Sequence, residues 1–147
     1  MYLDPLYDPD RAYSPKIEIN KCKFFNATGD YGGALTILSA GIGHTRQAKS
    51  PLYLFFGDLD MNDCEFYDNT ALYSGGAVYI SGINGTIKNT KFYRNKISYD
   101  LDNESTGGGL YIDFSNATIE NCEFINNTKQ GIYAYDNHYI KYESTYE

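Results

Sequence analysis

The chain has 147 residues, with 12 Lys and Arg against 19 Asp and Glu, and its net charge is -7. This length suits a single domain, and an acidic charge without a basic cluster argues against nucleic acid and anionic membranes as partners. No apolar run approaches the ~20 residues of a membrane-spanning helix, so we expect no membrane insertion by this segment. Sixteen tyrosines, eight phenylalanines and thirteen asparagines favour a β-rich chain with many turns.

The first segment, residues 1–16, is expected to be a lead-in or a cap. Residues 1–6 do not combine a basic stretch with a following apolar one, so the sequence shows no readable export signal. The repeats begin immediately after this segment.

Residues 17–134 contain four copies of one short pattern. An aliphatic residue is followed three positions later by Cys or Thr, and two positions after that by Phe. The copies occupy residues 19–24, 61–66, 87–92 and 119–124. A glycine-led apolar stretch follows each copy, beginning at Gly32, Gly75, Gly108 and Gly131. Such recurrence predicts a solenoid, in which each unit buries its apolar face against its neighbours.

Each unit is predicted to run strand, bend, strand, turn, strand. Apolar residues alternate around Cys64 and Phe66 and again around Val78 and Ile80, which indicates strands with one buried face. The three-residue step before Cys or Thr requires a bend, where asparagine tolerates the left-handed backbone region. In-register stacking of such units predicts an all-β fold, a parallel β-helix of about four rungs with variable loops.

One outward position carries charges that alternate in sign along the chain: Lys23, Glu65, Lys91 and Glu123. Stacked in register, these residues would place opposite charges side by side, which supports the proposed alignment.

The first interval between copies is the longest, and its surplus residues fall at about 41–56. Residues 51–56 are strongly apolar. We expect this insertion to cover part of the core or to form an extra short strand, leaving Lys23 and Glu65 as neighbours.

The last segment, residues 135–147, is expected to be a tail. It follows the fourth unit without an amphipathic cap, and natural solenoids cover their exposed end strands. We therefore expect the chain to be a fragment of a longer protein.

The Phe-x-x-Asn spacing of Phe66 and Asn69, its counterpart Phe124 and Asn127, and the Gly-Gly-Ala-Val sequence at 75–78 resemble polymorphic outer membrane protein repeats. The chain departs from these motifs at Ala27 and Gly109. The repeats belong to the right-handed parallel β-helix class similar to pectin lyase, and the resemblance implies a secreted or cell-surface protein.

Two functions are compatible with this class: a non-catalytic module for adhesion or ligand binding, which we favour, and a fragment of a carbohydrate-active enzyme, either a polysaccharide lyase or a glycoside hydrolase. The polygalacturonase-type Asn-Thr-Asp, Asp-Asp and Gly-His-Gly elements are absent from the sequence, and we assign no catalytic residue. The histidines, His44 and His138, lie in no recognisable nucleophile motif.

No cofactor or metal is expected. Cys22, Cys64 and Cys122 share one inward position, where they either fill the core as thiols or pair, although parallel side chains give poor disulfide geometry. Their spacing matches no zinc motif. The acidic stretches at 58–60 and 100–104 are either solvated loops or a calcium site, and we favour the former.

Tyr79, Tyr111 and Tyr133 are predicted to point outward in one column, and Phe25, Tyr67 and Tyr93 in a second. The first column is the candidate ligand site, either a platform for a glycan or protein ligand or a self-stacking ladder that stabilises the sheet. On the expectation that these rings are exposed, their replacement should cost little stability.

Asn-x-Ser/Thr sequences occur at five positions: Asn26, Asn84, Asn103, Asn116 and Asn126. These asparagines are either glycan acceptors or residues favoured by β-helix turns.

Overall fold

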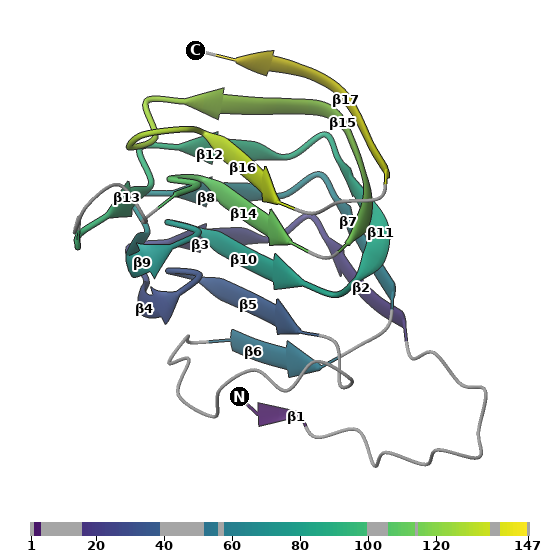
Figure 1. Ribbon diagram of the computed structural model, residues 1–147, viewed down its shortest axis with the longest axis horizontal. Coiled ribbons are helices and arrows are strands. Elements are labelled where there is room, and N and C mark those ends of the chain that lie inside the picture. Colours follow the sequence, from purple (N-terminus) through teal and green to yellow (C-terminus); the bar gives the residue numbers. More distant parts are fainter. Residues whose placement is uncertain are drawn as a thin grey trace.

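The computed structural model describes residues 2–3, 16–38, 52–55, 58–99, 106–113, 115–135 and 139–146. These residues form no helix, and their strands belong to three parallel β-sheets, named sheets A, B and C (Figure 1). Sheet A has the strand order β1 (Tyr2–Leu3), β6 (Leu52–Phe55), β5 (Leu35–Leu38), β10 (Val78–Ser81), β14 (Leu110–Asp113) and β16 (Ile132–Tyr135).

Sheet B bends into two arms. The first arm contains β2 (Lys16–Asn20), β7 (Asp58–Asn62), β11 (Asn84–Lys88) and the start of β15 (Asn116–Ile125). The second contains β3 (Lys23–Phe25), β8 (Glu65–Tyr67), β12 (Lys91–Tyr93) and the end of β15, and β17 (Tyr139–Tyr146) pairs with β15. Sheet C consists of β4 (Thr28–Tyr31), β9 (Thr70–Ser74) and β13 (Lys96–Ile97).

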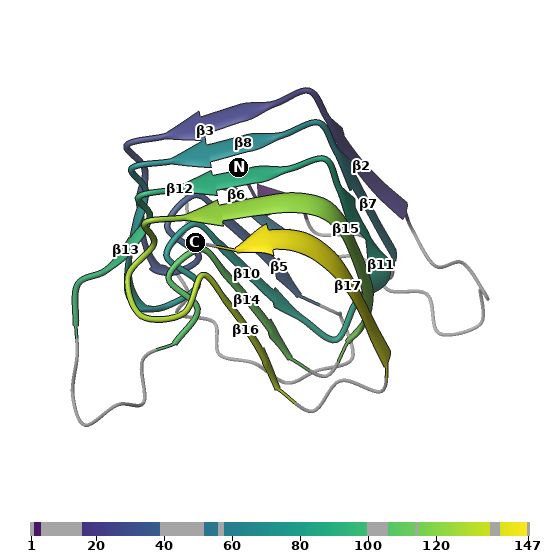
Figure 2. The ribbon, with the colours of Figure 1, turned by 90° about the horizontal axis from the view of Figure 1, so that it is seen from above.

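The chain winds through these sheets in the order B, C, A, and Figure 2, seen from above, shows the sheets enclosing one interior. The four sequence units form four successive turns that pair in register, with Phe24 opposite Phe66, Phe66 opposite Phe92 and Phe92 opposite Phe124. The predicted parallel β-helix is confirmed. β17 follows in the segment that the sequence assigns to the tail, where it pairs with β15.

The predicted bend between the arms of sheet B is present in every turn, with one residue in the left-handed region: Lys21, Asp63, Asn89 and Asn121, at φ between 50 and 55°. Asparagine therefore fills this position in only two of the four turns. A second left-handed corner follows the second arm of sheet B at Asn26, Asp68, Arg94 and Asn126, and at the first three of these it leads into sheet C.

The core is a set of stacked columns. The phenylalanine column is the largest, with ring centroids 4.7, 5.1 and 4.7 Å apart from Phe24 to Phe124. Phe66, Phe92 and Phe124 have no exposed surface. Two neighbouring columns hold the aliphatic residues (Ile19, Met61, Ile87, Ile119) and the small residues (Cys22, Cys64, Thr90, Cys122).

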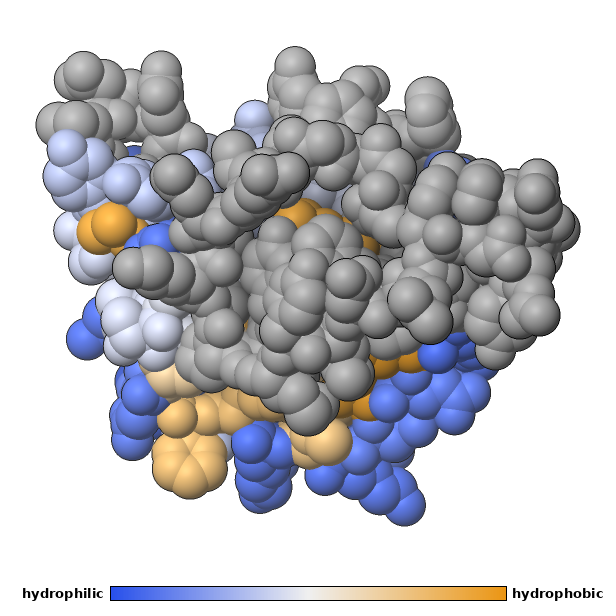
Figure 3. All heavy atoms as spheres, turned by 90° about the horizontal axis from the view of Figure 1, so that it is seen from below, coloured by the Kyte–Doolittle hydropathy of each residue, from blue (hydrophilic) through white to orange (hydrophobic). Residues whose placement is uncertain are grey.

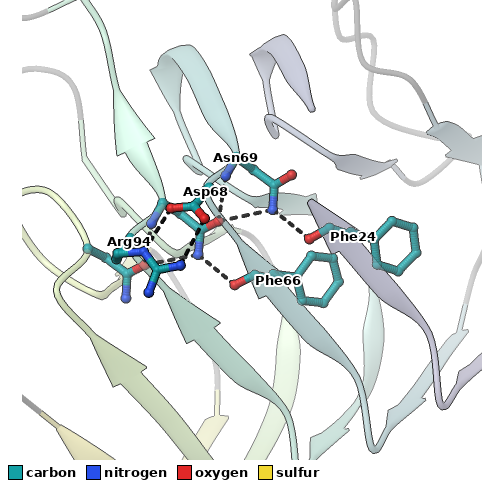
Figure 4. A network of polar contacts seen from close by, with 7 residues as sticks. Phe24, Phe66, Asp68, Asn69 and Arg94 are labelled. Carbon is teal, nitrogen blue, oxygen red and sulfur yellow. Dashed lines mark hydrogen bonds and ion pairs between the residues drawn. The ribbon is translucent and has the colours of Figure 1, made fainter. Parts of the chain in front are cut away.

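A buried asparagine ladder runs beside the phenylalanines. The Asn69 side-chain nitrogen donates to the Phe24 carbonyl and to Asn95 Oδ1, both at 3.0 Å (Figure 4). The Asn95 nitrogen repeats this pattern with the Phe66 carbonyl and Asn127 Oδ1, again at 3.0 Å. The motif asparagine thus links each turn to the next.

The ladder stops in the first turn, where Ala27 replaces the motif asparagine. The Ala27 N–H still donates to Asn69 Oδ1 at 3.0 Å, so the backbone takes part although the side chain cannot. At the outer corner beside the ladder, Arg94 forms a two-pronged ion pair with Asp68, at 2.8 Å for each contact.

The glycine pair of the first three units allows neighbouring turns to approach closely. A Cβ at Gly76 would lie 1.9 Å from the Gly108 carbonyl oxygen, and one at Gly108 would lie 1.9 Å from the Thr128 carbonyl oxygen. No side chain fits between these backbones, which explains the motif physically.

The insertion forms the predicted extra strand, and its position is informative. β6 pairs in parallel with β5, on the side of β5 that faces away from β10. Sheet B holds no additional rung, because β2 pairs directly with β7 and β3 with β8. Lys23 and Glu65 are therefore neighbours, with 3.1 Å between Lys23 Nζ and Glu65 Oε2, as predicted.

The first turn lies at one edge of the core. Ile17, Cys22, Phe24 and Ala27 are only partly buried, and Phe25 is 55% exposed. Figure 3 shows apolar, orange spheres at this end of the stack, bordered by hydrophilic residues in blue.

Candidate functional site

Tyr79, Tyr111 and Tyr133 form one column on the outer face of sheet A. They are paired in register on β10, β14 and β16. The residues on either side of Tyr79 and of Tyr111 in the strand are buried in the core. Their ring centroids are 4.8 and 5.4 Å apart, with interplanar angles of 3 and 21°. The structure thus brings together the three residues that the sequence selects as a ligand site.

The rings of this column are half-buried rather than exposed, which differs from the sequence expectation. Because they stack almost parallel, each ring covers the face of its neighbour. Along its length the column therefore offers ring edges and hydroxyl groups to a ligand. A sugar that stacks on an aromatic face would need a different ring of this surface.

Three further tyrosines extend the column towards sheet C. Tyr31 meets Tyr79 edge-on at 5.3 Å and Tyr73 at 5.2 Å, and Tyr99 meets Tyr73 at 5.7 Å. Tyr73 and Tyr99 are 37% and 43% exposed. The six residues, Tyr31, Tyr73, Tyr79, Tyr99, Tyr111 and Tyr133, are called the tyrosine patch below.

Sequence analysis missed Tyr31, Tyr73 and Tyr99. A local signal was present, because Tyr31 and Tyr73 both come shortly before a glycine pair that turns the chain from sheet C into sheet A. Their contact with Tyr79 depends on how the outer faces of the two sheets meet at that turn.

A half-buried hydrogen bond holds one tyrosine of the patch. The Tyr79 hydroxyl donates to Asp113 Oδ2 at 3.4 Å. Burial and the nearby Asp113 carboxylate raise the pKa of Tyr79 far above its usual value. Its hydroxyl therefore stays protonated and orients the ring at the base of the patch.

The second predicted column, Phe25, Tyr67 and Tyr93, lies on the second arm of sheet B, away from the tyrosine patch (Figure 2). Phe25 and Tyr67 stack at 5.2 Å. The Tyr93 hydroxyl donates to Glu123, and this hydrogen bond is the main reason that the pKa of Tyr93 is raised to about 12. The residues of alternating charge on the same strands lie beside this column, with Lys91 Nζ 3.9 Å from Glu123 Oε1.

In a comparison with known protein families, the family described as right handed beta helix region matches residues 12–145. The chain belongs to the right-handed β-helix family. No curated protein and no solved structure gives a significant match.

The cysteines of this β-helix are free thiols. Cys64 and Cys122 are buried, and Cys64 Sγ donates to the carbonyls of Ile19 and Asn62 at 3.4 Å. Burial raises the pKa of the Cys64 thiol. Both features are typical of thiols that fill a core.

Several of the remaining candidates from sequence analysis lie outside the described residues: His44, His138, Asn103 and residues 100–104. Asp60 lies on the outer face of β7, where it accepts from Lys16 Nζ at 3.3 Å and from Thr86 Oγ1 at 3.2 Å. Within the described ranges, no three acidic, His or Cys side chains cluster as a metal site would need. None of those ranges contains a helix able to cross a membrane.

Proposed function

We propose that this β-helix is a non-catalytic, secreted or cell-surface module that binds a glycan or protein ligand through the tyrosine patch. The observation that supports the proposal is the continuity of the patch, in which six tyrosine rings contact one another across sheets A and C. Tyrosine combines a large apolar ring with a polar hydroxyl, and such residues are enriched at binding surfaces.

The stacking within the patch favours binding entropically. A side chain that is already held by its neighbours loses little rotamer freedom when a ligand arrives, so less of the interaction energy is spent on ordering. The Tyr79 hydrogen bond to Asp113 fixes one end of the stacked column in the same way.

The exposed fractions indicate where a ligand would make contact. Tyr73 and Tyr99 are the most exposed rings of the tyrosine patch and are the proposed apolar contacts. Tyr111 and Tyr133 would contribute edges and hydroxyls, which suit hydrogen bonding to sugar hydroxyls or to a polypeptide backbone. Neither kind of contact requires turnover of the ligand.

The first experiment separates binding from catalysis. The purified chain is applied to a glycan array and is also incubated with acidic polysaccharides while released oligosaccharide is measured. The proposal predicts retention of a glycan without release. Release of oligosaccharide would instead support the carbohydrate-active enzyme, whereas an empty array would reject the sugar ligand and leave a protein ligand as the one to test.

The second experiment tests the stacked column itself. Tyr79→Ser with Tyr111→Ser is expected to weaken binding and, because both rings are half-buried and stacked, also to lower the melting temperature. A double variant that is less stable but binds like the wild type at a temperature where it remains folded would assign the column a purely structural role.

A further inference from the structure

The asparagines of the Asn-x-Ser/Thr sequences differ from those that hold the fold together. Four of the five lie in the described ranges, and all four are exposed: Asn26, Asn84, Asn116 and Asn126. The ladder asparagines are buried or half-buried, and none of them begins such a sequence: Asn69, Asn95 and Asn127. The structural use of asparagine in the ladder therefore does not account for these sequences.

Two of the four have a backbone explanation. Asn26 and Asn126 occupy the left-handed corner that follows the second arm of sheet B, at φ of 51 and 54°. Asparagine is one of the residues that tolerates this conformation, so the turn alone explains its presence.

Asn84 and Asn116 have no such explanation. Asn84 is the first residue of β11 and Asn116 the first residue of β15, and neither has a positive φ. The same register position carries Lys16 in β2 and Asp58 in β7. Asparagine is also disfavoured in strands, so its choice here points to a role outside the fold.

The two sites present the same chemistry side by side. Asn84 pairs with Asn116, and Thr86 pairs with Thr118, in neighbouring parallel strands. Within each strand the Asn and Thr share the outer face, while the intervening Gly85 or Ala117 faces inward. Each strand therefore carries an exposed Asn and a half-buried Thr on its outer face, and the Thr86 hydroxyl donates to Asp60 Oδ1 at 3.2 Å.

We propose that Asn84 and Asn116 together form one acceptor position for an N-linked oligosaccharide, which a folded chain fills at only one of the two residues. Neighbouring strands are about 4.8 Å apart, which is less than the width of a branched oligosaccharide. Asn26 and Asn126, by contrast, are separated by three strand spacings, or about 14 Å, so both can be occupied.

The transfer step is a substitution at a sugar carbon. The donor is a polyprenyl-pyrophosphate-linked oligosaccharide. The side-chain amide nitrogen of Asn84 or Asn116 forms a bond to C1 of the first sugar and loses a proton, while the bond from C1 to the pyrophosphate oxygen breaks and the lipid pyrophosphate leaves. No oxidant or reductant is needed.

This acceptor position lies on the first arm of sheet B, whereas the tyrosine patch lies on sheets A and C (Figure 2). A glycan there would be attached to a different sheet from the patch. The proposed glycosylation rests on one part of the proposed function, namely that the chain passes through a secretory compartment. Ligand binding can be measured on protein made in bacteria, so failure of one proposal is distinguishable from failure of the other.

The test counts glycans on intact, secreted chains made in eukaryotic cells with an added signal peptide. Asn103→Gln, Asn26→Asp and Asn126→Asp remove the other acceptors, and aspartate is already accepted at the equivalent corner residue Asp68. The expected mass corresponds to one glycan per folded chain. Folded chains that carry two glycans, or none, would overturn the proposal.

A second comparison keeps the test independent of that triple variant. In the otherwise unaltered chain, Asn84→Gln should leave the glycan count unchanged, because Asn116 takes the glycan, whereas Asn26→Asp should lower the count by one. Loss of one glycan from Asn84→Gln would show that the two residues are modified separately and would contradict the proposal.

Discussion

Asn69 donates from its side-chain nitrogen to the side-chain oxygen of Asn95, 3.0 Å away in the next turn of the coil. The same Asn95 oxygen accepts from the Asn69 backbone N–H at 3.1 Å. Both residues have no exposed surface. The Phe-x-x-Asn motif is therefore a polar connection between turns inside a mainly apolar stack.

Replacing Asn95 by Ala is expected to cost about 2 to 4 kcal/mol of unfolding free energy, because the Asn69 N–H groups and the Phe66 carbonyl lose a buried partner. Urea unfolding measures this loss. Asn84→Ala is the matched control, since Asn84 is exposed, and it should change stability by less than about 0.5 kcal/mol. Equal losses in both variants would contradict the ladder's structural role.

Ala27→Asn tests the same ladder in the opposite direction. The introduced amide can donate to Asn69 Oδ1, which already accepts from the Ala27 N–H. We expect a gain of about 0.5 to 1.5 kcal/mol, the usual contribution of one hydrogen bond. Differential scanning calorimetry should show a higher melting temperature, and a lower one would mean that the first turn cannot accommodate the ladder.

Phe66→Ala should remove about 3 to 5 kcal/mol, because the ring is fully buried between Phe24 and Phe92 and its loss leaves a cavity. A solenoid of four turns is expected to unfold at this cost. Phe25→Ala is the control, since Phe25 is 55% exposed on the outer face. An unchanged melting curve for Phe66→Ala would reject the inward assignment.

Tyr93 makes stability depend on alkaline pH. Its pKa is raised to about 12 by the hydrogen bond to Glu123, whereas an unfolded tyrosine titrates near pH 10. The folded state therefore holds this proton more tightly, so the stabilisation is complete below about pH 10 and is lost as the pH rises towards 12. Tyr93→Phe should lose less stability than the wild type between about pH 10 and 12 in urea titrations. If the variant and the wild type lost the same stability over this pH range, Tyr93 would not be the cause of the alkaline pH dependence.

The turns of the coil could be predicted from sequence because the repeats carry the same information several times. Alternation around Phe66 predicted the inward column, and the signs of Lys23 and Glu65 predicted their contact, which the 3.1 Å distance confirms. Repetition also removes register errors, since a one-residue slip in any copy would turn its phenylalanine outward.

The insertion shows where sequence reasoning stops. The apolar residues at 51–56 predicted either a cover for the core or an extra short strand, and β6 confirms the strand, but its place in the sheet depends on which edge is open. β10 occupies one side of β5, so β6 pairs on the other side. In the sheet β6 therefore lies between β1 and β5, although it follows β5 in the chain.

The candidate site was predictable only in part. The column of Tyr79, Tyr111 and Tyr133 follows from strand register. That their rings cover one another's faces, and that Tyr73 and Tyr99 provide the exposed rings, depends on side-chain packing between sheets A and C, which has no counterpart in residue spacing.

The most direct measurement of the proposed function compares two variants on the glycan array that screens the wild type. Tyr73→Ser with Tyr99→Ser removes the most exposed rings of the tyrosine patch, and Tyr67→Ser removes a ring from the second column on sheet B. The account predicts that the first variant loses binding at least about tenfold, or about 1.4 kcal/mol, at an unchanged melting temperature, while Tyr67→Ser binds as the wild type does. Wild-type binding by the first variant, with loss in Tyr67→Ser, would contradict the tyrosine patch as the ligand site.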